Sequence, residues 1–182
     1  MTNETPTSVI TDEIRALIGA KSEPFTAWDS VESGAVRRFC QAIMDDDRAY
    51  WDEEYAKGTK YGGVIAPPLY PGFTGRRPPG TPDPLDRFKD EPDWDGATGG
   101  RGGPGQLPPI DIPFKRLLNG GVSAEFFAFC KPGDRITGQR EYIEITERTG
   151  RTGLMAIIVS ETTYTNQDGL LLSKVRNTTI RR

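Results

Sequence analysis

The sequence predicts an α+β fold, with helices gathered on one face of an antiparallel sheet. Two observations carry this prediction. Apolar residues recur at helical spacing only before residue 57, whereas residues 122–180 hold strand-length runs rich in β-branched and aromatic residues, separated by turn signals. The regular alternation of strands and helices that builds a parallel sheet does not occur in the sequence.

Three helical segments are expected before the sheet. Thr11 is placed to cap a helix over residues 11–20. A second helix is expected over residues 33–44, and a short helical turn over residues 52–57. Apolar residues of the second helix recur at spacings of three and four, so they should form one buried stripe, made of Val36, Phe39, Cys40 and Ile43.

Four strands should follow the helices. The β-branched and aromatic runs cover residues 122–130, 134–146, 153–165 and 170–180. Between them lie the turn-forming pairs Pro132-Gly133 and Asp168-Gly169, and Gly150. Because each connection is short, consecutive strands are expected to pair as an antiparallel meander.

The composition changes between the helices and the strands. Residues 62–68, GGVIAPP, are a tight apolar segment that ends at two prolines, and residues 71–109 are then dense in Pro, Gly and Asp. Such a long irregular stretch in a compact domain is usually a functional or a mobile loop. We expect a long insertion with little regular structure. Its larger apolar residues either cover a substrate opening or a partner, or belong to a mobile surface loop; they are Phe73, Leu85, Phe88 and Trp94.

Length and charge narrow the classes of protein. A chain of 182 residues suits one domain, residues 1–182. The net charge of −3 provides no basic field for nucleic acid or for an anionic membrane. No run approaches the roughly 18 apolar residues of a membrane span, and the N-terminus lacks the pattern of a secretory signal, so we expect a cytoplasmic protein. Cys40 and Cys130 lie among apolar residues and are expected to be buried, reduced thiols.

Several kinds of site are excluded by the residues present. The chain has no histidine, so a Ser-His-Asp or Cys-His nucleophile and a histidine zinc site are impossible within it. The carboxylates of residues 45–54 lack the spacing of a calcium loop, so no metal site is expected. Residues 100–105 spell G-x-G-x-x-G, but Pro104, Pro108 and Pro109 forbid the helix that a dinucleotide site needs.

Four segments together carry a resemblance to a known family. They are residues 36–43 (VRRFCQAI), 45–56 (DDDRAYWDEEYA), 61–68 (YGGVIAPP) and 118–138 (LNGGVSAEFFAFCKPGDRITG). With the terminal strands, this set resembles the MaoC-like dehydratase family, in particular its N-terminal half-domain, over about residues 10 to 180. The resemblance implies a hot-dog fold, in which an antiparallel sheet wraps around a helix, here interrupted by the insertion of residues 71–109.

The resemblance also implies a substrate class and a site. Active members of the family bind acyl-CoA or acyl-carrier thioesters and add water across a trans-2-enoyl thioester, or remove it. Asp45 takes the place of the family's catalytic aspartate, whereas Tyr50 stands where the catalytic histidine would be, and Asp47 stands in place of an asparagine. A tyrosine, with a pKa near 10, is a poor base at neutral pH, so the pair Asp45 and Tyr50 is expected to be a degenerate dyad.

A non-catalytic subunit is the function that follows from this resemblance. The chain ends at Arg182, directly after a predicted strand, so we expect a separate hot-dog subunit to supply the histidine and aspartate of a heteromeric enoyl-CoA hydratase. This chain would form half of the tunnel for a bulky acyl group, such as a steroid side-chain, aromatic or long-chain acyl. No cofactor is expected, because CoA is part of the substrate.

Residues that match the family's acyl site are candidates for substrate binding. They are Gly62, Gly63, Ile65, Ala66 and Pro67, and the backbone N–H of Ile65 or Ala66 is a candidate oxyanion donor. The alternative for this segment is a buried turn before the family's central helix. The arginines Arg76, Arg77 and Arg101 either contact CoA phosphates or are simply solvated.

Two other functions remain open at this stage. One is a catalytically silent scaffold that holds acyl-CoA for a thiolase-type or aldolase-type partner. The other is a stand-alone homodimeric hydratase or thioesterase that uses Asp45 or Glu125.

Overall fold

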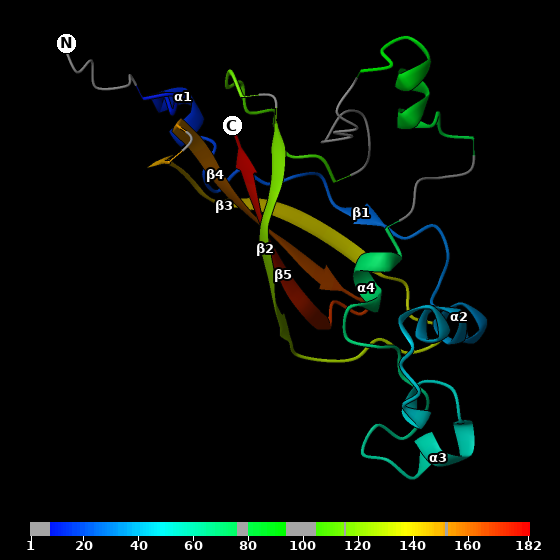
Figure 1. Cartoon of the computed structure of the whole chain (residues 1–182). Helices are drawn as coiled ribbons and strands as arrows, with labels where there is room; N and C mark the ends of the chain where they lie inside the picture. Colours follow the sequence, from blue (N-terminus) through cyan, green and yellow to red (C-terminus); the bar gives the residue numbers. More distant parts are fainter. Residues whose placement is uncertain (1–7, 76–79, 94–104, 115, 152) are drawn as a thin grey trace, which may run out of the picture.

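A computed structural model describes residues 8–75, 80–93, 105–114, 116–151 and 153–182 of the chain. Its centre is a five-stranded antiparallel sheet with the strand order β1-β3-β4-β5-β2 (Figure 1). The strands are β1 (Phe25–Thr26), β2 (Leu117–Phe126), β3 (Thr137–Gly150), β4 (Gly153–Thr165) and β5 (Leu171–Arg181). The structure therefore confirms the predicted α+β class and the hot-dog type of sheet.

The strand predictions agree best where turns are unambiguous. β4 has the predicted bounds, and β3 and β4 form a hairpin that closes with Gly150 opposite Gly153. The largest difference is in β2, which begins five residues earlier than expected and ends at Phe126. The register of β2 shifts between Asn119 and Gly121, so the two glycines of this segment form a β-bulge inside the strand.

The pairing register divides the sheet into two faces. We call inner the face that carries Ile158 and Tyr164 of β4, because these side chains belong to the two buried clusters of the core. Val175 of β5 and Phe126 of β2 lie on the same face. Residues that pair across antiparallel strands point to the same side, and Phe126 pairs with Ser173, which pairs with Tyr164. Glu161 lies on the opposite, outer face, where Arg176 donates to its carboxylate at 2.7 Å.

Four α-helices and two 3₁₀ helices accompany the sheet. They are α1 (Asp12–Arg15), α2 (Ser33–Ile43), η1 (Arg48–Tyr50), α3 (Glu53–Lys57), α4 (Tyr70–Phe73) and η2 (Pro84–Lys89). Thr11 caps α1 as predicted, although the helix stops after one turn. The stripe of α2 is confirmed at Val36 and Cys40, which are buried, but it is wrong for Ile43, which is 49% exposed.

The core consists of two clusters that cover different parts of the inner face. One packs α2 and α4 against the end of the sheet that carries Tyr164 and Leu172, and the Phe39 ring lies edge-on to Tyr70 with centroids 5.4 Å apart. The other packs α1 and the segment around Ile110 and Ile112 against β3 and β4. Cys40 and Cys130 are free and buried, as predicted.

The helix after Pro68 is very short. α4 has four residues, YPGF, and ends at Thr74. Pro71 is tolerated in its first turn, but Gly72 and Gly75 disfavour continuation. As a result, α4 covers the Tyr164 end of the inner face, and every residue of β2 except Ala124 is exposed. Among the described residues, no helix is long and apolar enough to cross a membrane.

Both ends of the central part of the insertion pack against the aromatic ring of Phe25. Gly75 and Gly105, which flank its central part, both approach the ring of Phe25 on β1, and Gly138 of β3 approaches it from the sheet. The ring also lies edge-on to Tyr164, 6.4 Å between centroids. A Cβ at Gly105 or Gly138 would overlap the ring, and one at Gly75 would lie 3.1 Å from a ring carbon, so Phe25 packs closely against both ends of the insertion. The short 3₁₀ helix η2 lies within the insertion.

Gly138→Ala should lower the free energy of unfolding by about 1 to 3 kcal/mol, because the added methyl group would overlap the Phe25 ring. Urea denaturation of the two proteins measures the difference. Gly34→Ala in α2 is the matched control, since a Cβ there meets nothing within 4 Å and alanine favours a helix. Equal stability of the Gly138→Ala variant and the unsubstituted protein would show that the ring is not closely packed.

Candidate functional site

A pocket of about 530 Å³ lies at the C-terminal end of α2. Residues of the last two turns of α2 form one wall, and the loop that follows the helix forms the other. Its lining residues are Arg37, Cys40, Gln41, Met44, Asp45, Asp46 and Trp51. The pocket thus contains Asp45, the residue at the position of the family's catalytic aspartate.

Met44 sets the direction in which the chain leaves α2. Its φ of 56° and ψ of 38° are left-handed, and it is the one non-glycine residue with positive φ in the described part of the chain. This conformation ends the helix and lets the N–H of Asp45 donate to the carbonyl of Cys40 at 3.0 Å. Left-handed backbone is unfavourable for methionine, and the side chain is 91% exposed.

Tyr50 is the residue that the sequence resemblance aligns with the family's histidine. It ends η1, is half-buried, and packs against the core cluster of α2. Burial, followed by the charges of Asp45 and Asp47, raises the pKa of the Tyr50 phenol above its usual range. The structure therefore brings the two degenerate positions together, but the raised pKa leaves even less phenolate at neutral pH than an exposed tyrosine would have, so Tyr50 cannot take a proton there.

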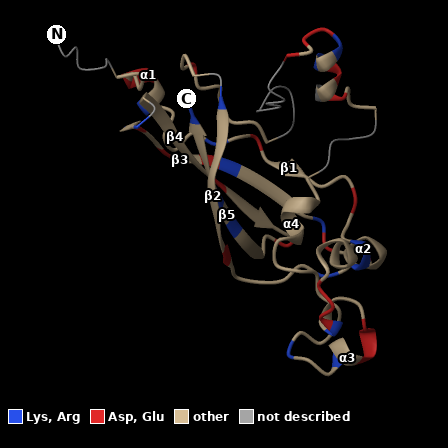
Figure 2. Cartoon of the chain, viewed as in Figure 1, with Lys and Arg blue, Asp and Glu red and all other residues tan. Residues whose placement is uncertain are grey.

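The other carboxylates of this loop serve the local backbone. Asp47 accepts from the N–H of Ala49 at 2.9 Å and caps η1. Asp52 accepts from the N–H of Tyr55 at 3.0 Å, which caps α3, and forms an ion pair with Arg48 at 2.7 Å. Figure 2 shows the resulting concentration of acidic residues at α3 and beside it. An aspartate is unfavourable after the C-terminus of α2. Asp47 and Asp52 are favourable where they lie, because each caps the N-terminal end of the next helix, η1 or α3.

The segment of residues 62–68 approaches the core after this loop. Gly62 has a φ of 67°, and a Cβ at Gly62 or Gly63 would meet nothing within 4 Å. Ile65, Ala66 and Pro67 are buried. Whether these five residues line a substrate site stays a prediction.

The proposed oxyanion donors are wrong for this structure. The N–H of Ile65 donates to the carbonyl of Ala49 at 3.2 Å, and the N–H of Ala66 donates to the carbonyl of Cys130 at 2.8 Å. Because both groups are buried and already bonded, neither is available to a thioester carbonyl. The alternative of a buried turn describes these two residues better.

The remaining candidates do not join this site. Glu125 lies on the outer face of β2, opposite Lys174 in register, whereas α2 and α4 lie on the inner face. Phe73 belongs to α4, where it packs against Phe39 with centroids 5.1 Å apart. Leu85 and Phe88 are exposed on η2. The positions Arg76, Arg77, Trp94 and Arg101 lie outside the described residues.

Four lining residues of the pocket were not expected from the sequence. Arg37 and Gln41 are spaced i, i+4 on α2, so they lie on one side of the helix, and Met44 continues that side. Trp51 reaches the same pocket from the residue after η1, and its indole N–H donates to the carbonyl of Asp46 at 3.4 Å. The spacing on α2 is a signal in the sequence, but the position of Trp51 depends on how the loop folds back.

A family model resolves the assignment. The model described as FAS1-like, dehydratase domain region matches residues 16–175. The chain belongs to this family. It is a MaoC-like hot-dog domain, as the sequence resemblance predicted. No curated protein sequence matches this FAS1-like dehydratase domain at a significant level.

Solved structures share the fold of this domain at low sequence identity. The ChsH1-ChsH2 complex from Mycobacterium tuberculosis matches with a TM-score of 0.64 and 15% identity, over 88% of this chain and 83% of that chain. The MaoC-like dehydratase from Rhodospirillum rubrum matches with a TM-score of 0.58 and 19% identity, over 91% and 93%. The HadBC (3R-hydroxyacyl-ACP dehydratase) complex from Mycobacterium tuberculosis matches with a TM-score of 0.57 and 19% identity, over 90% and 96%.

Asp52→Asn should destabilise the FAS1-like dehydratase domain at neutral pH, and the difference should disappear in acid. The hydrogen bond from Tyr55 and the contact with Arg48 lower the pKa of Asp52, so its carboxylate stabilises the folded state above the unfolded-state pKa of about 3.9. This contribution is lost as the pH falls through the lowered, folded-state pKa.

Urea midpoints measured from pH 7 down to pH 3 test this prediction. Asp46→Asn is the control from the same loop. A difference between Asp52→Asn and the unsubstituted protein that stays constant over this range would show that the charge of Asp52 contributes nothing.

Proposed function

We propose that this domain is a non-catalytic subunit of a heteromeric hydratase or dehydratase that acts on enoyl thioesters. The observation that carries the proposal is Tyr50. It stands at the position of the family's histidine in a chain without histidine, and its pKa is raised rather than lowered. Family membership supports the reaction type, and the substituted dyad supports the non-catalytic role.

The reaction requires a base that Tyr50 does not provide. In hydration, the oxygen of water forms a bond to C3 of the enoyl thioester as a base removes its proton, and C2 receives a proton from an acid. Both groups must change protonation state near neutral pH. A tyrosine with a raised pKa keeps its proton there, so a histidine and an aspartate would come from the partner subunit.

Two of the similar structures support a partnered arrangement. Their names, ChsH1-ChsH2 and HadBC, each describe a complex of two components, and HadBC is named as a 3R-hydroxyacyl-ACP dehydratase. By analogy, this chain would pair with a second hot-dog subunit that carries the catalytic motif. We take CoA as the thioester carrier, and no further cofactor is required by this chemistry.

The contribution of this chain would be space for the acyl group. The short α4 covers one end of the inner face, and the β2 side of that face is exposed. A longer helix in the same position would fill this space with side chains. We therefore propose a bulky acyl group as the substrate, such as a long-chain, aromatic or steroid side-chain acyl.

Co-expression of this chain with the hot-dog proteins encoded beside it, followed by purification, tests the proposal. We expect a complex in which the second subunit carries a histidine and an aspartate of the family motif. The complex should hydrate trans-2-enoyl-CoA, followed by loss of the enoyl absorbance, whereas this chain alone should be inactive. Asp45→Asn and Tyr50→Phe in this chain should change the activity of the complex by less than about two-fold.

Two outcomes would contradict the proposal. If the chain alone hydrates enoyl-CoA and Asp45→Asn abolishes that activity, the protein is a homomeric enzyme that uses Asp45. If it co-purifies with a thiolase-type or aldolase-type enzyme and binds acyl-CoA without hydration, it is a scaffold subunit. Asp46→Asn is the control for a general effect of charge at the pocket.

A further inference from the structure

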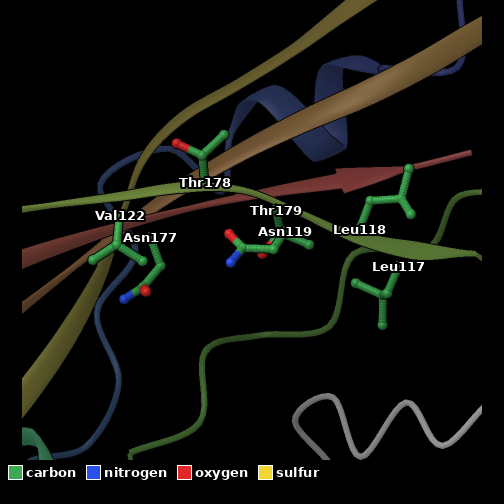
Figure 3. Close-up of a pocket in the computed structure, with 7 residues that line it drawn as sticks. All are labelled: Leu117, Leu118, Asn119, Val122, Asn177, Thr178 and Thr179. Carbon is green, nitrogen blue, oxygen red and sulfur yellow. The ribbon is translucent and has the colours of Figure 1, made fainter. Parts of the chain in front are cut away.

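A second hollow, of about 310 Å³, lies at the opposite end of the inner face, between β2 and β5. Figure 3 shows that Asn119, Val122 and Asn177 point to one side of these strands, whereas Leu118 and Thr178 point to the other. Leu117 and Thr179 complete the inner lining. Val122 is 58% exposed and Leu117 41% exposed, so apolar surface is uncovered here.

The β-bulge of β2 places these side chains together. Regular alternation would put Asn119 and Val122 on opposite faces, because they are three residues apart. The extra residue, Gly120, lets Asn119 pair with Thr179 and Val122 pair with Asn177, so all four share the inner face. A Cβ at Gly120 would lie 2.7 Å from a side-chain carbon of Thr178, which explains the glycine.

The hollow presents hydrogen-bonding groups that are neutral. The Oδ1 atom of Asn119 accepts from the N–H of Gly121 at 2.8 Å, which leaves its Nδ2 amide for a ligand. The Asn177 amide and the Thr179 hydroxyl make no hydrogen bond within the part of the chain that the structure describes. Donors and an acceptor therefore face one small volume, between the apolar side chains of Leu117 and Val122.

The nearest cation on the inner face is already occupied. Arg181 lies opposite Leu117 in register, but its guanidinium donates to the carbonyl of Ile110 at 2.8 Å and to the carbonyl of Phe114 at 2.9 Å. Within the described part of the chain, none of the residues that line the hollow is charged. A negatively charged ligand would gain no ion pair here and would lose its hydration.

The part of the inner face between β5 and β2 is not covered by a helix in the described structure, and we call it the open strip. One end of this strip lies beside α4, and the hollow lies at its other end. Ser173 and Tyr164, which pair in register, mark the covered end, and Thr179 and Asn119 mark the open end. Six residues of β5 separate Ser173 from Thr179, about 20 Å along the strand. At the covered end, the hydroxyl of Ser173 is buried without a partner among the described residues. An acyl group along this strip would be long or polycyclic.

We propose that the hollow binds a neutral hydrogen-bonding group, a ketone or a hydroxyl, at the distal end of the acyl group. The amide Nδ2 atoms of Asn119 and Asn177 donate to the distal oxygen, and Thr179 accepts from it where it carries a proton. This inference rests on the proposed function, and it defines the substrate class: a long acyl thioester that ends in a neutral polar group.

Three saturated probes of equal chain length, long enough to span the strip, test the inference on the complex described above: hexadecanoyl-CoA, 16-hydroxyhexadecanoyl-CoA and the thioester with a terminal carboxylate. Titration calorimetry gives their affinities. We expect the hydroxyl probe to bind about ten-fold more tightly than the plain probe, as one to two neutral hydrogen bonds would give. The carboxylate probe should bind no more tightly than the plain one, because the lining residues that the structure describes are all uncharged.

Substitutions that keep the size of the side chain but remove its hydrogen-bonding groups test whether the hydroxyl probe binds at the hollow. Asn177→Leu and, separately, Thr179→Val should reduce the preference for the hydroxyl probe to about two-fold or less while leaving the affinity for the plain probe nearly unchanged. Ser123→Ala is the control, because Ser123 is exposed on the outer face of the neighbouring strand β2. The comparison of the three probes on the unsubstituted complex stands even if a substituted chain fails to fold.

The outcomes separate this inference from the proposed function. Equal binding of the plain and hydroxyl probes, with hydration of trans-2-hexadecenoyl-CoA intact, overturns the neutral-group site and leaves the proposed function standing. A preference that survives both substitutions also overturns it, since the group is then bound elsewhere. If no probe binds and the complex does not hydrate enoyl-CoA, both proposals fail together.

Discussion

The structure depends on how the inner face of the sheet is covered. A five-stranded sheet with one apolar face must bury that face, and four short segments share this role here. α2 and α4 cover the end at Tyr164, while α1 and the segment around Ile110 cover β3 and β4. None of them reaches β2, so the strip between β5 and β2 is left open. The strip is open because α4 ends at Phe73 and does not continue along the sheet.

α4 ends because of glycines in and just after it. Gly72 lies beside the hydroxyl of Tyr164, and a Cβ there would be 3.4 Å from that oxygen. Gly75 then contacts the Phe25 ring, which also receives Gly105. The chain therefore packs against the Phe25 ring both before and after the central part of the insertion. Gly75 and Gly105 hold the two ends of the insertion's central part against this one ring.

The acidic loop after α2 is held in place by its own hydrogen bonds and ion pair. Asp47 and Asp52 stabilise the helices that follow them, and Arg48 links the two helices by its ion pair with Asp52. Asp45 remains half-buried in a pocket beside Tyr50. The backbone arrangement is thus retained for reasons of local stability that do not require a histidine. Such a loop would preserve the shape of a substrate pocket in a subunit that performs no proton transfer.

The sequence by itself determined the α+β class, the bounds of β4, the helix over residues 33–43 and the absence of a histidine base. These are local properties, set by periodicity, turn residues and composition. The tertiary structure decided the bonding of the Ile65 and Ala66 N–H groups, the position of Glu125 on the outer face, and the meeting of Asn119 with Asn177. Each depends on long-range pairing and on one extra residue in β2. Because a bulge exchanges the two faces of a strand for every residue beyond it, alternation in the sequence could not assign these side chains.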